Sequence, residues 1–242
     1  MTRRRWHADE ISGNHAVITG SHAEHLSRVL RARVGQIFDI TDGSRVRSGT
    51  ISRIESGQVE FELGPEIHSA TLQPITVLMS VFKFDRMEWA IEKCTELGVS
   101  RIIPIIAERT DSHLAAAANK RVLRWQRIAA QASEQSRRIS PPEISRPINL
   151  REAIDLPKGS CILLSESESE NMLIDALDSQ SNENISLAFG PEGGWTKQEL
   201  AAFHNAGWVS ASLGPTILRT ETAAISALAV ALAVLSRSAR CS

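Results

Sequence analysis

The chain has 242 residues, 42% of them hydrophobic, which is enough apolar material for one large or two modest folded domains. Its 27 basic and 28 acidic side chains nearly cancel, so no global charge indicates a polyanionic partner, and any nucleic-acid surface must be local. Three widely spaced cysteines fit neither a disulfide framework nor a zinc cluster, which favours a cytoplasmic protein without a metal site. The longest apolar run, residues 223–235, is too short to span a bilayer, so we expect no membrane segment.

Charge is unevenly distributed along the chain. Residues 1–53 hold nine basic against five acidic side chains, and residues 71–150 hold twelve against eight. Residues 151–200 hold three against ten. Such a distribution allows basic faces for an acidic polymer in a nearly neutral protein, and solvated helix faces explain the same counts equally well.

The first 70 residues predict a small β-barrel of short strands around one helix. Phe38 and Ile40 alternate with polar neighbours before Asp42-Gly43, a type I′ hairpin pattern, and residues 46–54 form the return strand. A capping box predicts the start of the helix. It pairs Ser21 with Glu24, and the helix buries Leu26, Val29 and Leu30.

From residue 75 onward, predicted strands alternate with predicted helices, which favours a mostly parallel sheet covered on both faces. Changes in composition between residues 64 and 74 place the domain boundary, giving domains 1–70 and 71–242. The strands are predicted at 75–81, 101–107, 161–164, 185–189 and 208–213, and the helices at 85–97, 120–138, 196–207 and 220–236. Capping boxes at Asp85/Glu88 and Thr196/Glu199 begin two of these helices.

The loops after Leu164, Phe189 and Leu213 are candidates for a ligand site, since open α/β sheets bind ligands beyond the carboxyl ends of their strands. Two of these loops have an unusual composition. Residues 190–194 read Gly-Pro-Glu-Gly-Gly and lead into a capped helix with free backbone amides. Residues 213–223 combine apolar side chains with Arg219 and Glu221. A plain tight turn also explains the glycines, and a structural ion pair also explains Arg219 and Glu221.

Several common enzyme classes are excluded by missing motifs. The chain has no Gly-x-Gly-x-x-Gly, no Gly-Lys-Ser/Thr, no Gly-x-Ser-x-Gly and no His-Glu-x-x-His. This argues against a dinucleotide-dependent dehydrogenase, a P-loop ATPase, a serine hydrolase and a zinc protease.

The two loops carry a family resemblance. Phe-Gly-Pro-Glu-Gly-Gly at 189–194 and Leu-Gly-Pro-x-Ile-Leu-Arg-Thr-Glu-Thr-Ala at 213–223 resemble the signature motifs of bacterial 16S ribosomal RNA uridine N3 methyltransferases of the SPOUT superfamily. Glu-Lys-Cys-Thr-Glu-Leu-Gly-Val at 92–99 and shorter matches elsewhere agree, in the same order and over nearly the whole chain. Thr216 stands where the family usually has Arg, and Arg137 where Gly is common.

The resemblance implies an α/β fold: a SPOUT-type parallel sheet with a C-terminal trefoil knot, preceded by a PUA-like barrel that binds RNA. Connection rules alone argue against a knot. The resemblance also implies a homodimer, which agrees with a last helix that is apolar nearly all round. A helix buried within one chain explains that pattern too.

The implied cofactor is S-adenosyl-L-methionine, the partner is 16S rRNA or the small ribosomal subunit, and the reaction methylates N3 of a uridine. Arg219 is expected to stabilise the uridine anion, and Glu221 to position groups or accept the proton. The expected cofactor residues are Leu164, Gly190, Pro191, Glu192, Gly193, Leu213, Gly214, Ile217, Leu218 and Thr222.

RNA phosphates are expected to contact arginines and a lysine outside those loops, namely Arg3, Arg4, Arg5, Arg28, Arg31, Lys83, Arg86 and Arg138. Two other functions remain open at this point. One is methylation of a ribose 2′-hydroxyl, and the other is a ribosome-assembly factor that binds RNA without catalysis.

Overall fold

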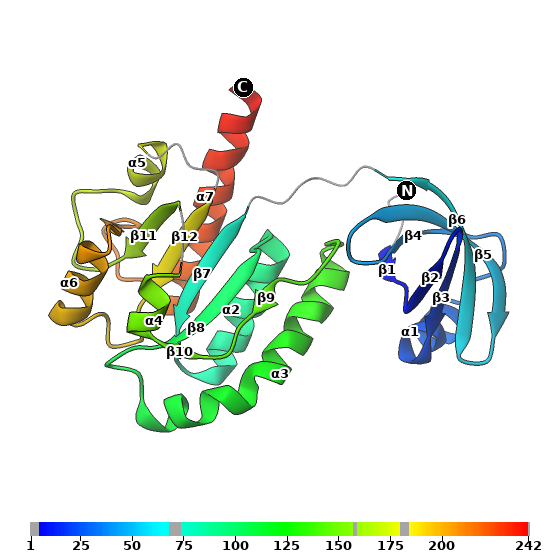
Figure 1. The fold of residues 1–242 in the computed structure, drawn as a ribbon, viewed down its shortest axis with the longest axis horizontal. Coiled ribbons are helices and arrows are strands. Elements are labelled where there is room, and N and C mark those ends of the chain that lie inside the picture. Colours follow the sequence, from blue (N-terminus) through cyan, green and yellow to red (C-terminus); the bar gives the residue numbers. More distant parts are fainter. Residues whose placement is uncertain (1–4, 68–73, 157–158, 180–183, 242) are drawn as a thin grey trace. The chain divides into compact units, whose positions relative to one another are not determined.

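The computed structural model describes residues 5–67, 74–156, 159–179 and 184–241 (Figure 1). The chain forms two compact units, residues 1–71 with 133–140 and residues 72–132 with 141–242. The segment 133–140, which the sequence analysis assigns to the second part of the chain, is grouped with the first unit.

The first unit is built on a six-stranded sheet in the order β1-β4-β5-β6-β3-β2, antiparallel except for the β1–β4 pair. Only Ala8 and Asp9 separate β1 from β2 along the chain, so the sheet curls until its two end strands are consecutive. Ile18, Leu26 and Phe61 lie fully buried inside it. The elements are β1 (Arg5–His7), β2 (Glu10–Ser12), β3 (His15–Thr19), α1 (Gly20–Glu24), β4 (Ile37–Thr41), β5 (Val46–Glu55) and β6 (Gln58–Glu66).

Two local predictions for this unit are wrong. The β4–β5 connection is a four-residue loop, because the Asp42 carboxylate accepts hydrogen bonds from the amides of Ser44 and Arg45. These bonds lower the pKa of Asp42 to about 2. Ser21 lies inside α1 rather than before it, and the helix continues as a π-helical turn, His25–Val29, on which Val29 is exposed.

The second unit contains a parallel sheet in the order β10-β8-β7-β12-β11-β13, with β9 paired to β8. The predicted parallel sheet is therefore confirmed. Its strands are β7 (Ile75–Ser80), β8 (Arg101–Ile106), β9 (Glu143–Ile144), β10 (Ile148–Asn149), β11 (Ser160–Leu164), β12 (Ile185–Phe189) and β13 (Val209–Ala211). Its helices are α2 (Phe84–Leu97), α3 (Ser112–Gln135), α4 (Leu150–Ile154), α5 (Leu173–Asp178), α6 (Lys197–Asn205) and α7 (Thr220–Cys241).

Helices cover both faces of this sheet (Figure 1). One apolar cluster joins alternate strand residues such as Val77 and Leu187 to α2, α3, α5 and α7. A second cluster joins the intervening residues, such as Leu78 and Ala188, to α4 and α6. Burial on both faces explains the continuous apolar runs of β7 and β12.

The observed starts of three helices differ in how well they match the predicted ones. The Thr196/Glu199 capping box of α6 is confirmed, with both of its hydrogen bonds present. The Asp85/Glu88 box is wrong, because α2 begins at Phe84 after Lys83, without a side-chain cap. Helix α3 begins eight residues before the predicted start.

Helix α7 has a window, Thr220–Arg237, whose length and composition alone would suit a membrane span. One side of it, including Ala224, Leu228 and Ala231, belongs to the core of the second unit and packs against α2. Only a third of the window is buried within the single chain. Helix α7 is therefore part of the core on one side and carries additional apolar side chains outside that side.

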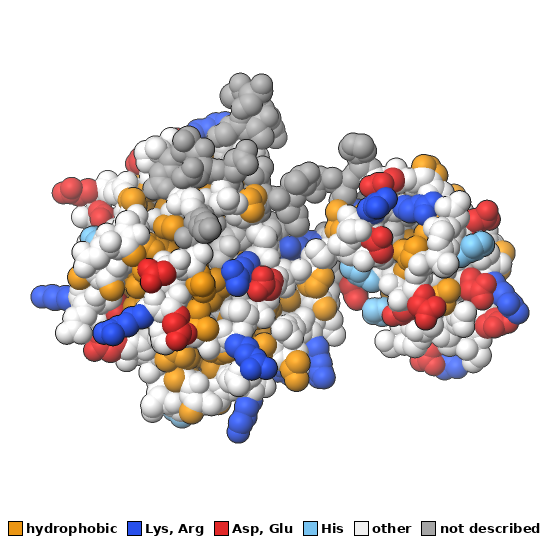
Figure 2. Space-filling view, in the orientation of Figure 1, with side chains coloured by type: hydrophobic (Ala, Val, Ile, Leu, Met, Phe, Trp, Pro, Cys, Tyr) orange, Lys and Arg blue, Asp and Glu red, His pale blue; other side chains and the backbone are white. Residues whose placement is uncertain are grey.

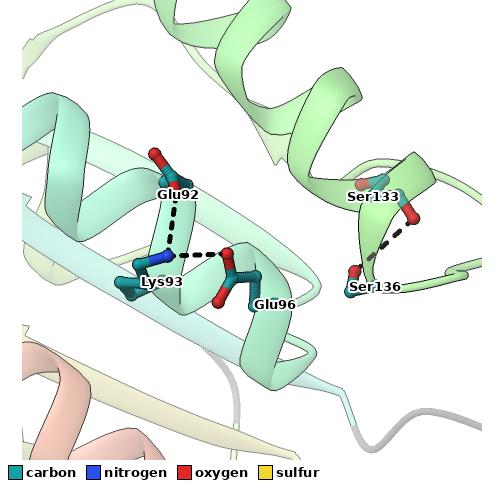
Figure 3. A network of polar contacts seen from close by, with 5 residues as sticks. All are labelled: Glu92, Lys93, Glu96, Ser133 and Ser136. Atoms are coloured by element: carbon teal, nitrogen blue, oxygen red, sulfur yellow. Dashed lines mark hydrogen bonds and ion pairs between the residues drawn. The ribbon is translucent and has the colours of Figure 1, made fainter.

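Lys93 lies between Glu92 and Glu96 on α2, at 2.7 and 2.8 Å from their carboxylate oxygens (Figure 3). These hydrogen bonds raise the pKa of Lys93. The charged residues of the 92–99 motif thus form an ion-pair network on the helix, outside the residues that line the cavity described below.

The thiol of Cys94 generates a pH prediction. Burial raises its pKa from 9.0 to about 12, so the thiol ionises in the unfolded chain before it does in the folded one. The unfolded state then binds fewer protons, and the free energy of unfolding falls above pH 9 by up to ~1.4 kcal/mol per pH unit from this group. The free energy of unfolding, measured by urea denaturation between pH 8 and 10.5, should decline more steeply with pH for wild type than for Cys94→Ala. Equal slopes would contradict the prediction.

Candidate functional site

A cavity of about 470 Å³ lies where three parallel strands of the second unit end. Leu164, the last residue of β11, pairs with Phe189 at the end of β12 and with Ala211 at the end of β13. All three residues line the cavity, so the strands reach it at one level. This is the edge at which parallel α/β sheets bind ligands, and the cavity falls within the ~300–1,000 Å³ typical of small-molecule sites.

The loop after β12 forms one wall, and its glycines are required by close neighbours. A Cβ atom on Gly190 would stand 3.2 Å from the indole ring of Trp195. Gly194 has φ +67° and lies against the Glu166 carboxylate, which a Cβ would approach to 2.9 Å. The buried Trp195 fills the space under the loop and donates a hydrogen bond to the Leu164 carbonyl at 3.1 Å.

The loop after β11 forms a second wall and is held by hydrogen bonds. Residues 165–167 line the cavity. Glu168 accepts from the amides of Glu170 and Asn171, which lowers its pKa, and the Asn171 side chain donates to the Ser210 carbonyl at 2.7 Å. Residues 165–170 therefore form an exposed loop held by hydrogen bonds, and its first three residues belong to the site.

The loop after β8 supports the glycine loop from outside. Arg109 lines the cavity and donates to the Gly193 carbonyl at 2.7 Å. The buried Glu199 carboxylate accepts from the amides of Glu108 and Thr196, each at 2.8 Å. A buried carboxylate is stable only when its oxygens are paired in this way.

Arg86, in the first turn of α2, lies between two carboxylates. Its Nη1 is 2.6 Å from Oε1 of Glu192 in the glycine loop, and its Nε is 3.8 Å from Oε1 of Glu221 in the first turn of α7. The Glu221 side chain is only 8% exposed. Glu221 therefore pairs with Arg86, where the sequence also allowed a pair with Arg219.

The chemistry available in the cavity is that of binding and orientation. Its lining combines apolar side chains such as Leu213 and Ile217 with the charged Arg109, Glu166 and Lys197. Among the described residues no cluster of His, Cys, Asp or Glu could hold a metal ion. Such a lining suits an organic molecule with an apolar part and charges of both signs.

Comparison with known proteins decides the family. A family model described as an RNA methyltransferase domain matches residues 69–232. The ribosomal RNA small subunit methyltransferase E of Synechocystis is 32% identical over 227 residues, covering 90% of this chain and 73% of that protein. The chain therefore belongs to the ribosomal RNA small subunit methyltransferase E family.

Other relatives agree with this assignment. The methyltransferase E of Rickettsia conorii is 31% identical and covers 86% of this chain and 85% of its own. The crystal structure of the Neisseria gonorrhoeae methyltransferase E, bound to S-adenosylmethionine, has a TM-score of 0.83 at 30% identity. That match covers 96% of this chain and 98% of the Neisseria chain.

In this member of the methyltransferase E family, the cavity brings together seven of the ten residues expected to hold the cofactor: Leu164, Gly190, Pro191, Leu213, Gly214, Ile217 and Leu218. It is not lined by the other three. Glu192 faces Arg86, the Gly193 carbonyl accepts from Arg109, and Thr222 is exposed. Arg219 is exposed and Glu221 buried, and neither lines the cavity.

The residues expected to bind RNA fall into three groups. Arg3 and Arg4 lie outside the described residues. Arg28, Arg31 and Lys83 are exposed, and Arg28 lies 3.9 Å from the Glu24 carboxylate one turn earlier. The others are engaged within the protein: Arg5 donates to the Arg137 carbonyl, Arg86 pairs with two glutamates, and Arg138 is buried, which lowers its pKa to about 10.

The two departures from the family pattern have clear positions. Thr216 is exposed and lines the cavity. Arg137 adopts φ +59°, the left-handed region that favours glycine, which is the residue that the family resemblance leads us to expect there.

Figure 2 shows basic and acidic side chains interspersed on the drawn face of each unit. Ion pairs within the protein engage several basic side chains, among them Arg86, Lys93 and Arg124.

Sequence reasoning missed several residues of the site. Arg109, Trp195 and Lys197 line the cavity and were not expected there. Arg109 follows a predicted strand of the same parallel sheet. The rule that ligands bind beyond the carboxyl ends of parallel strands, which indicated the other loops, would also have indicated Arg109. Trp195 carries no such signal, because its role depends on packing under a loop.

Proposed function

We propose that the protein transfers the methyl group of S-adenosylmethionine to N3 of a specific uridine in 16S ribosomal RNA. The observation that carries the proposal is the convergence of both signature loops on one cavity at the ends of β11, β12 and β13. The methyltransferase E relative bound to S-adenosylmethionine has the same fold and a similar sequence throughout.

The residues present fit this cofactor. Glycines let the backbone approach a ligand closely, and Leu213, Ile217 and Leu218 offer apolar surface for an adenine ring. Glu166, Arg109 and Lys197 offer both signs of charge for the amino and carboxylate groups of a methionine moiety. S-adenosylmethionine supplies an activated methyl group, so the protein's task is mainly to orient donor and acceptor.

Arg219 has the position and chemistry to act on the acceptor. N3 of uridine must lose its proton, and negative charge then spreads over the two neighbouring carbonyl oxygens. Arg219 stands between Leu218 and Thr220, which line the cavity, and its side chain is exposed. We assign Arg219 to stabilising this anion and Glu221, buried against Arg86, to positioning.

The first unit is proposed as the RNA-binding domain, of the PUA-like kind, and the second as the methyltransferase domain. N3 lies on the Watson–Crick edge, so the target uridine must be unpaired and turned outward. The exposed Arg28 and Arg31 of the first unit and Lys83 of the second are proposed phosphate contacts.

The second unit is proposed to contain the trefoil knot. Strand β13 lies at one end of the sheet beyond β11, yet α7 returns from it to pack against α2, β7 and β12. It does so on the face that also carries α5, the helix connecting β11 to β12. This return path past an earlier connection is what a threaded chain requires.

A homodimer is also proposed. Helix α7 is apolar nearly all round, and beside its buried side it carries the exposed Ala229 and Ala233 and the half-buried Val230. A second copy would cover that surface. The unpaired thiols of Cys94 and Cys161, and the ribosomal substrate, favour a cytoplasmic location.

Analysis of nucleosides tests the reaction directly. Ribosomal RNA from a strain lacking the protein should lack 3-methyluridine, and the purified enzyme with S-adenosylmethionine should restore it to the small subunits of that strain. Digestion and mass spectrometry distinguish the products. A 2′-O-methylated nucleoside would replace the proposed reaction with ribose methylation, and no cofactor binding heat would indicate a non-catalytic RNA-binding factor.

Arg219→Met should lower kcat about 100- to 1,000-fold, the usual effect of removing one group that stabilises a developing anion. Affinity for S-adenosylmethionine, measured by calorimetry, should stay unchanged because Arg219 does not line the cavity. Arg219→Lys, which keeps the charge, should retain part of the activity. A kcat unaffected by the Met substitution would exclude this role.

Gly194→Ala and Gly207→Ala form a matched pair, because both glycines have positive φ, at +67° and +82°. Each substitution should lower the free energy of unfolding by about 1 kcal/mol through backbone strain. Only Gly194→Ala should weaken cofactor binding, since its methyl group displaces Glu166 at the cavity, whereas Gly207 has open space around it. Equal cofactor affinity in the two variants would contradict the assignment of the cavity.

A further inference from the structure

Arg86 joins three elements that are far apart in the sequence. It belongs to the first turn of α2, and the two carboxylates beside it belong to the two signature loops, Glu192 to residues 190–194 and Glu221 to the start of α7. The 2.6 Å contact to Glu192 is a close hydrogen-bonded ion pair, and the 3.8 Å contact to Glu221 is a looser one.

Glu221 needs a nearby cation. Its side chain is 8% exposed, and its Oε2 atom is buried without a hydrogen-bond partner among the described residues. Removing an ionised carboxylate from water is costly unless an opposite charge is close. The amides at the start of α7 favour a negative charge in its first turn, and Arg86 supplies the cation facing it.

The two loops also contact each other directly. The Thr220 hydroxyl, next to Glu221, donates to the Gly190 carbonyl at 3.2 Å. Gly190 and Thr220 both line the cavity. Arg86, Glu192 and Glu221 do not line the cavity, but each glutamate is next in sequence to a residue that does, Pro191 and Thr220.

We propose that Arg86 is a positioning residue for the cofactor cavity, holding the glycine loop and the start of α7 together through Glu192 and Glu221. This inference deepens the proposed function and rests on it. A planar guanidinium can serve two carboxylates from different directions, which the single ammonium of lysine does less well. Arg86 is thereby removed from the set of expected phosphate contacts.

The test compares cofactor binding with RNA binding in Arg86→Met and Arg86→Lys. The Met variant should bind S-adenosylmethionine about tenfold more weakly, as expected when one partner of a partly buried charge cluster is lost. Its KM for the RNA substrate should stay within about twofold of wild type, with an unchanged salt dependence. The cofactor affinity of Arg86→Lys should lie between those of wild type and Arg86→Met.

Arg124→Met is the matched control. Arg124 pairs with Glu88 at 2.6 and 2.8 Å on the surface of α2 and α3, away from both loops. The Arg124→Met substitution should leave the affinity for S-adenosylmethionine and the KM for RNA unchanged. Circular dichroism at the assay temperature confirms that each variant is folded. If Arg86→Met does not fold, the Lys variant carries the comparison.

A second substitution tests the physical cause. Glu221→Gln removes the uncompensated charge, so the double variant Arg86→Met/Glu221→Gln should bind the cofactor more tightly than Arg86→Met alone.

A raised KM for RNA with a shallower salt dependence in Arg86→Met would overturn the proposal and make Arg86 a phosphate contact. Unchanged cofactor affinity in Arg86→Met, or no recovery in the double variant, would also overturn it. Failure of the wild-type protein to bind the cofactor would instead overturn the proposed function.

Discussion

The glycine loop at 190–194 has a hydrogen bond of its own, from the Gly194 amide to the Pro191 carbonyl at 2.8 Å, but most of its shape depends on its neighbours. The architecture around the loop follows from this constraint. Glycine brings the backbone close to a ligand but has no side chain that packs or pairs. The loop is therefore fixed by its neighbours, Arg109 on the Gly193 carbonyl, Thr220 on the Gly190 carbonyl and Trp195 beneath. These neighbours come from the loop after β8, the first turn of α7 and the residue before the Thr196 cap of α6, so the cavity forms only when the parallel sheet is complete.

Two buried carboxylates beside this loop are compensated in different ways. Glu199 accepts hydrogen bonds from two backbone amides, one of them in its own helix cap, and needs no cation. Glu221 faces a guanidinium from another helix. Backbone amides form a fixed element of the fold, whereas a side-chain cation can be removed by one substitution. The start of α7, which carries Glu221, is therefore more sensitive to a change in charge than the start of α6, which carries Glu199.

The sequence predicted those parts of the fold whose cause is local. The runs 75–81 and 185–189 are apolar because both faces are buried, and the Thr196 box closes within four residues. The same pattern failed at Ser21, because α1 begins earlier, after Thr19, whose amide and hydroxyl bond to Asp9. Helix α3 was predicted too short although four consecutive alanines, 115–118, favour helix at its start.

The site shows the limit of sequence reasoning for charged residues. The motifs located the cavity, and seven of its expected lining residues are there. They did not separate arginines that are buried or half-buried within the protein from arginines at its surface. Arg86, Arg138 and Arg28 look alike in sequence, yet the first lies between two carboxylates, the second is buried, and the third is exposed. An arginine's partners depend on contacts across the fold, so its function can be assigned only after its ion pairs are known.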